Sequence, residues 1–165
     1  DLALPGFLAH QDRFIREHPG HEIYTCNVLA LTPQGVKTPF HTDELHTREG
    51  SFALETMLDG NQMLSQGTIF SRGIFTELDG FREDLRYNED YDFWLRALAQ
   101  GASHRHNPEF LTVYTIAQGT KTGDRGALIK DVRRVFEDLV ESGTLTAGQQ
   151  RRARRRLRGL GTVER

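Results

Sequence analysis

Apolar residues recur along the chain with two alternating periods, a pattern that predicts strands separated by helices. β-branched and aromatic residues dominate residues 22–31 and 110–116, as is typical of strands. Shorter strands are predicted at residues 68–71 and 102–107. Residues 36–50 are polar and follow a Pro-Gln-Gly turn, so they are predicted to form a loop. Strands that alternate with helices indicate an α/β fold.

Apolar residues spaced three and four apart predict the helices. The clearest helix starts at Asn88, whose side chain is predicted to cap it, and ends before Gly101. Trp94 and Phe93 lie on or beside its apolar stripe and are predicted to belong to the core. Further helical segments are predicted over residues 4–17, 52–58, 74–78, 128–139 and 146–157.

The composition is that of one globular domain. Apolar residues make up 37% and charged residues 27% of the 165 residues, and no apolar run is long enough to span a bilayer. The single cysteine, Cys26, excludes an intrachain disulfide and is predicted to be a small buried hydrophobe. Within the domain we distinguish a body, residues 1–117, from a loop and helical tail, residues 118–165.

The net charge of −2 conceals an asymmetry between the two ends of the chain. Residues 151–165 carry seven arginines and one glutamate, a charge of +6, which leaves −8 on residues 1–150. Two interpretations remain open: a solvated terminal helix, or a surface that contacts phosphate groups or an anionic membrane. No aromatic residues lie between the arginines, which argues against binding to single-stranded nucleic acid.

Three carboxylates lie at the start of the helix that follows Asn88. Glu89, Asp90 and Asp92 fall in its first turn, where free N–H groups and the positive end of the helix dipole favour acids. These acids either only stabilise the helix, or one of them acts as a general base at the edge of a cleft. Glu89 and Asp90 point about 100° apart on a helix, so they cannot share one task. Asp92 is expected to contribute only about 0.3–1 kcal/mol of stability through the dipole.

A longer pattern surrounds these acids. Residues 67–72 form a predicted strand and turn, residues 78–81 read Leu-Asp-Gly-Phe, and residues 88–96 place a Glu-Asp pair before Phe-Trp-Leu-Arg. This order resembles the C-terminal half of family 2 glycosyltransferases. The first 35 residues, with Asp1, Pro5 and His18-Pro19, resemble the segment that follows the D-x-D metal-binding motif of that family. The resemblance covers about residues 1–116, and the helical tail is similar to those of many bacterial members.

The resemblance implies part of a GT-A domain, with a mixed sheet flanked by helices and a C-terminal helical tail. It implies an inverting transfer of a sugar from a nucleotide-sugar donor to a hydroxyl of a glycan or lipid-linked acceptor. Asp90 would be the general base, and Glu89 would help to shape the acceptor pocket. A Mg²⁺ or Mn²⁺ ion would neutralise the departing diphosphate, and Asp1 is the candidate ligand that this chain contains. We expect a cytoplasmic protein whose basic tail can contact the inner face of the membrane.

The sequence departs from the family pattern in several places. Asp79 stands where the family turn usually has the first of two glycines. Many members continue their last strand with Tyr-Arg-x-His, but here residues 114–117 read Tyr-Thr-Ile-Ala. Phosphate contacts would then come from residues such as Lys121 or Arg125, or the donor binds differently. The nucleotide-binding units of the family are not in this sequence, so the chain is expected to be a fragment that is inactive alone.

The histidines and the tail leave a second hypothesis open. His41, His46, His104 and His106 lack acid or cysteine partners at a recurrent zinc-ligand spacing, so they are predicted to be solvated or hydrogen-bonded. The alternative to an enzyme is a non-catalytic binding module whose arginine-rich tail contacts nucleic acid or an anionic membrane.

Overall fold

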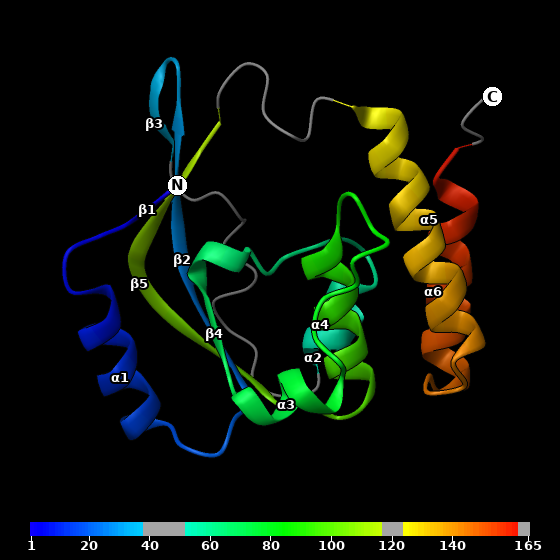
Figure 1. Ribbon diagram of the computed structural model, residues 1–165, viewed down its shortest axis with the longest axis horizontal. Helices are drawn as coiled ribbons and strands as arrows, with labels where there is room; N and C mark the ends of the chain where they lie inside the picture. The colour runs from blue at the N-terminus through cyan, green and yellow to red at the C-terminus, as the bar shows by residue number, and fades with distance from the viewer. Residues whose placement is uncertain (38–51, 117–123, 162–165) are drawn as a thin grey trace.

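The computed structural model describes residues 1–37, 52–116 and 124–161, which form an α/β fold with a five-stranded mixed sheet flanked by helices (Figure 1). The two long strands are parallel neighbours at its centre. The other three pair antiparallel with them, in the order β1-β5-β2-β3, with β4 also on β2. The strands are β1 (Leu2–Ala3), β2 (Ile23–Thr32), β3 (Gly35–Lys37), β4 (Thr68–Phe70) and β5 (His104–Thr115).

The helices lie on both sides of this sheet. In Figure 1, α1 lies on one side and α2 and α4 lie on the other, with α5 and α6 paired on the far side of α4. A single turn of 3-10 helix, η2 (Ser65–Gly67), precedes β4. The helices are α1 (Phe7–Glu17), α2 (Phe52–Met57), α3 (Arg72–Glu77), α4 (Glu89–Ala99), α5 (Arg125–Glu141) and α6 (Ala147–Gly159). Among the described helices, none is both long and apolar enough to cross a membrane.

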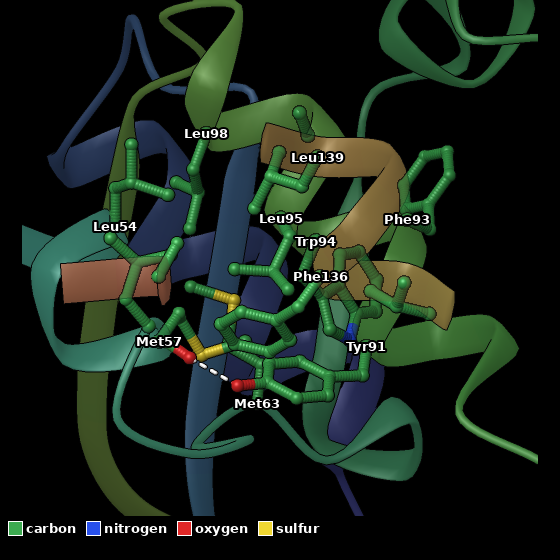
Figure 2. Close-up of a cluster of buried hydrophobic side chains, with 14 of the residues drawn as sticks. Leu54, Met57, Met63, Tyr91, Phe93, Trp94, Leu95, Leu98, Phe136 and Leu139 are labelled. Carbon is green, nitrogen blue, oxygen red and sulfur yellow. Dashed lines mark hydrogen bonds between the residues drawn. The ribbon is translucent and has the colours of Figure 1, made fainter. Parts of the chain in front are cut away.

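α4 supplies the centre of the main hydrophobic core. Phe93, Trp94 and Leu95 are completely buried, as the sequence predicted for the two aromatic residues (Figure 2). The Tyr91 hydroxyl donates a hydrogen bond to the main-chain oxygen of Met57, which ties α4 to α2. The helical tail shares this core with the body through Val132, Val135, Phe136 and Leu139 of α5, Ala153 of α6, and Leu160 directly after α6.

The region of residues 102–116 differs from its prediction. The sequence predicted two strands there, but the structure has one, β5, which runs through Pro108. Proline has no N–H for the ladder and is tolerated in a strand at a bulge. The register between β2 and β5 shows a bulge at this proline, because Cys26 pairs with Asn107 while the next residue of β2 pairs with Phe110. The residues in between therefore form a bulge, and the strand continues beyond it.

The N-terminus and the first loop also differ from their predictions. The first helix begins at Phe7 rather than at residue 4, because Gly6 has a φ of 83°, which ends the preceding turn in the left-handed region. The residues before this turn pair with β5 as β1. The loop was predicted from residue 36, but residues 36 and 37 belong to β3, and residues 38–51 lie outside the described part of the chain. Residues 117–123, at the start of the predicted loop and helical tail, also lie outside it.

Candidate functional site

The start of α4 is formed by an unusual backbone conformation at Asn88. Asn88 occupies the N-cap position with a φ of 61°, in the left-handed region that asparagine tolerates better than most residues. The predicted side-chain cap is wrong, because Asn88 Nδ2 donates instead to the main-chain oxygen of Leu128 on α5, at 3.3 Å. Asn88 therefore links the start of α4 to α5, and its main-chain oxygen accepts the first helical bond, from Asp92.

Asp90 lies half-buried in this first turn, and its carboxylate has neutral partners. Ser65 Oγ donates to Asp90 Oδ2 at 2.7 Å, and the main-chain N–H of Tyr91 is 2.6 Å from Oδ1. Burial raises the pKa of the Asp90 carboxyl above its usual range, and the neighbouring charge of Glu89 acts in the same direction. The hydrogen bonds from Ser65 and Tyr91 partly oppose this shift. Asp90 is thus a carboxylate with increased basicity.

Ser65 reaches Asp90 because η2 lies close to the sheet. A Cβ atom added to Gly67 would lie 2.9 Å from Val28 Cγ2 and 3.3 Å from the main-chain oxygen of Cys26. Glycine at this position therefore allows η2 to pack against β2. This packing brings the exposed Ser65 next to the start of α4. The sequence did not indicate Ser65 as a site residue.

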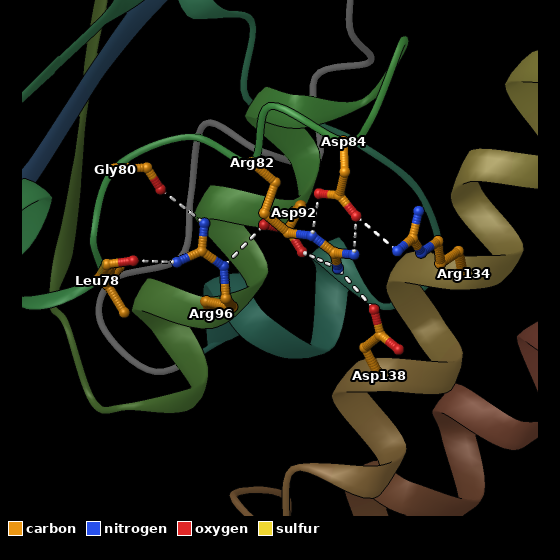
Figure 3. A network of polar contacts seen from close by, with 8 residues as sticks. All are labelled: Leu78, Gly80, Arg82, Asp84, Asp92, Arg96, Arg134 and Asp138. Carbon is orange, nitrogen blue, oxygen red and sulfur yellow. Dashed lines mark hydrogen bonds and ion pairs between the residues drawn. The ribbon is translucent and has the colours of Figure 1, made fainter.

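Asp92 has different surroundings, although it belongs to the same turn. It is buried, with 3% exposure, and Arg96 Nε donates to its Oδ2 at 2.7 Å. Arg82 Nη1 lies 3.5 Å from Asp92 Oδ1. The remaining guanidinium nitrogens of Arg96 donate to the main-chain oxygens of Leu78 and Gly80 (Figure 3). Asp92 therefore holds α4 to the turn after α3, and the expectation that it acts only through the helix dipole is wrong.

This network of ion pairs continues onto α5. Arg82 also donates to Asp84, at 2.9 and 3.0 Å, and to Asp138 of α5, at 2.6 Å (Figure 3). A cavity of about 130 Å³ lies beside the network between α4 and α5, with Arg82, Asp92, Arg96 and Asp138 in its wall. These four charged groups are paired with one another, so the cavity offers little to a charged ligand.

Asp1 lies at the exposed start of the chain, next to the end of β5. Its Oδ1 accepts a hydrogen bond from the main-chain N–H of Thr115 at 2.8 Å. Among the described residues, no group of three or more histidines, cysteines or acids is placed to hold a metal ion. The carboxylate of Asp1 alone offers fewer ligands than Mg²⁺ or Mn²⁺ requires. The metal-ligand role of Asp1 stays a prediction.

Two of the histidines form a polar cluster on the sheet. Thr25 Oγ1 lies 2.7 Å from His104 Nε2 and 2.9 Å from His106 Nδ1. His106 Nε2 lies 3.1 Å from Asn27 Oδ1. Burial lowers the pKa of His104 to about 3, assisted by the charges of His106 and His21. The prediction of hydrogen-bonded imidazoles is therefore confirmed for this pair, while His41 and His46 lie outside the described residues.

Acid should destabilise the protein through His104. Its folded pKa of about 3 is below the ordinary histidine pKa of 6.5, so the folded state keeps it neutral while the unfolded state binds a proton. The stabilisation is complete above pH 6.5 and is lost as the pH falls toward 3, by at most about 1.4 kcal/mol per pH unit. Chemical denaturation between pH 7 and pH 4 measures this effect. The free energy of unfolding of His104→Gln should fall less steeply with decreasing pH than that of the wild type. Equal slopes for both proteins would contradict this assignment, and the difference at pH 7 reports the altered hydrogen bond alone.

Three further residues were considered from the sequence, namely Cys26, Arg125 and Lys121. Cys26 is buried in β2, as predicted, and burial raises the pKa of its thiol to about 11, so it is not a thiolate at neutral pH. Arg125 is exposed at the first position of α5. Lys121, the other residue considered for phosphate contacts, lies outside the described residues.

Comparison with known proteins finds no matching family model, no similar curated protein and no similar solved structure. The assignment of a function therefore depends on the side chains at the start of α4.

Proposed function

We propose that the chain is the acceptor-side part of an inverting glycosyltransferase with a GT-A domain, in which Asp90 is the general base. The observation that carries the proposal is the environment of the Asp90 carboxylate. It lies at the start of α4 with Ser65 and a main-chain N–H as partners, and burial raises its pKa. The order of motifs from residue 67 to residue 101 supports the family assignment.

The contrast between Asp90 and Asp92 separates a base from an acid that only supports the fold. Asp92 is buried and paired with the guanidinium of Arg96, so its carboxylate is engaged within the fold and does not face an acceptor. Asp90 accepts hydrogen bonds from neutral groups that leave lone pairs on both carboxylate oxygens. An aspartate with a raised pKa removes a proton better than an exposed one does.

The proposed reaction is a single displacement. A hydroxyl of the glycan or lipid-linked acceptor gives its proton to a carboxylate oxygen of Asp90 while its own oxygen attacks the anomeric carbon of the donor sugar. The new carbon–oxygen bond forms on the face opposite the nucleoside diphosphate, whose bond to the sugar breaks with its electron pair. The configuration of the anomeric carbon is therefore inverted. Ser65 holds the Asp90 carboxylate in position, and Glu89 borders the acceptor.

A transfer assay on the protein at its natural length tests this proposal. Incubation with a panel of nucleotide sugars and with glycan or lipid-linked acceptors should release nucleoside diphosphate and form a glycoside of inverted anomeric configuration, measured by NMR. A matched acceptor that lacks the attacking hydroxyl should give no product. Retention of configuration, or donor hydrolysis that acceptor does not stimulate, would contradict the proposed mechanism.

A further inference from the structure

The arginines of α6 lie on two different faces of the helix. Gln149, Arg152, Ala153 and Arg156 are the inner residues, and they are buried or half-buried against the body. Arg152 Nε donates to Asp59 Oδ1 at 2.9 Å, and a second bond joins the same two side chains. Arg152 therefore attaches α6 to Asp59, which follows α2, and Gln149 attaches it to Glu55 of α2.

The outer face of α6 carries the remaining arginines. We call Arg151, Arg154, Arg155 and Arg158 the outer arginines; all four are exposed, and their spacing of three, four and seven residues aligns them in one row. Arg155 remains 72% exposed at its side chain, although its Nη2 lies 3.8 Å from Asp59 Oδ1. Within the described residues, no carboxylate lies in ion-pair distance of the other three. The row is thus a positively charged surface that the fold itself leaves largely unpaired.

We propose that the outer arginines form a docking surface for an anionic phospholipid bilayer. Figure 1 shows α5 and α6 at the side of the molecule that is farthest from α1, and the burial pattern shows that all four outer arginines are exposed there. Residues 1–150 carry a charge of −8 and residues 151–165 carry +6, so a negative surface attracts the tail and repels the body. This charge separation would orient the protein with α6 against the headgroups.

The shape of the row favours a flat partner over a nucleic acid. The opposite face of α6 packs on the core through Ala153, so the outer arginines can be contacted from one side only. α6 contains no aromatic residue on which a base could stack. Its outer face also lacks large apolar residues, so contact would be with headgroups, without insertion, and sensitive to salt.

Vesicle binding tests the proposal independently of glycosyl transfer. The full chain should sediment with phosphatidylcholine vesicles that contain phosphatidylglycerol, but not with pure phosphatidylcholine, and salt should weaken the binding. Each basic residue near an anionic surface contributes about fivefold to the partition coefficient, so replacing all four outer arginines with glutamine should reduce it several-hundred-fold. The matched control replaces four exposed arginines elsewhere, Arg16, Arg72, Arg86 and Arg125, with glutamine and has the same net charge.

The two variants give opposite results if the proposal is correct. The control should keep most of the vesicle binding, and both variants should retain cooperative thermal unfolding. Equal losses in both variants would overturn the proposal, since net charge alone would then explain the binding. Unchanged vesicle binding of the variant that lacks the outer arginines would also overturn it. So would a wild-type protein that binds duplex DNA or RNA more tightly than the anionic vesicles, if the same variant loses that binding.

Discussion

Replacement of Asp90 by asparagine is expected to reduce kcat for sugar transfer by about 10²–10⁴-fold, the usual contribution of a general base. Asparagine preserves the shape of the side chain and can still accept a hydrogen bond from Ser65, but it cannot take a proton from the acceptor. The melting temperature should change little, because Asp90 has neutral partners and is only half-buried. Initial rates and thermal unfolding of the protein at its natural length measure both quantities.

Two further substitutions separate the base from its neighbours. Glu89→Gln should have a milder effect on kcat, because Glu89 borders the acceptor and takes no proton. Ser65→Ala removes a hydrogen bond that lowers the pKa of Asp90, so the acid limb of the pH–rate profile should move to higher pH. If Asp90→Asn keeps more than about a tenth of the wild-type rate, Asp90 is not the base.

The helices and the core could be predicted from the sequence, but the partners of the acids could not. Helical spacing after Asn88 indicates α4 and its buried aromatic residues, because each side chain follows from its position in one helix. Ser65 lies 25 residues before Asp90, and it reaches the carboxylate only because Gly67 lets η2 approach β2. Contacts of this kind depend on the packing of several elements and leave no local signal.

Asp92 is a case in which the local signal was present but incomplete. An acid in a first helical turn is usually exposed, and the helix dipole accounts for its presence there. Arg96, four residues later, indicated a partner within the helix. Arg82 reaches Asp92 from the turn after α3, and that contact gives the acid a second guanidinium. The sequence therefore could not distinguish a surface pair from a buried network.

For the same reason, Asp92→Asn should give the largest loss of stability among the three acids. In this variant Arg96 keeps its bonds to Leu78 and Gly80 but loses its carboxylate partner. Water cannot easily replace that partner, because Asp92 is only 3% exposed. Breaking a buried ion pair typically costs 3–5 kcal/mol, and both arginine side chains are 22–25% exposed, so we expect about 3 kcal/mol. For a chain of this length that corresponds to a fall in Tm of about 6–12 °C.

Asp84→Asn is the matched control for this loss, because it removes one carboxylate from the same network at a more exposed position. The Asp84 side chain is 46% exposed, so water can replace the contacts that it makes with Arg82 and Arg134. Its Tm should therefore fall much less than that of Asp92→Asn. If the two variants lose equal stability, the network acts as a surface cluster, and burial of Asp92 does not hold α4 to the turn after α3. If Asp92→Asn instead reduces kcat as strongly as Asp90→Asn while its Tm is unchanged, the roles of the two acids are reversed.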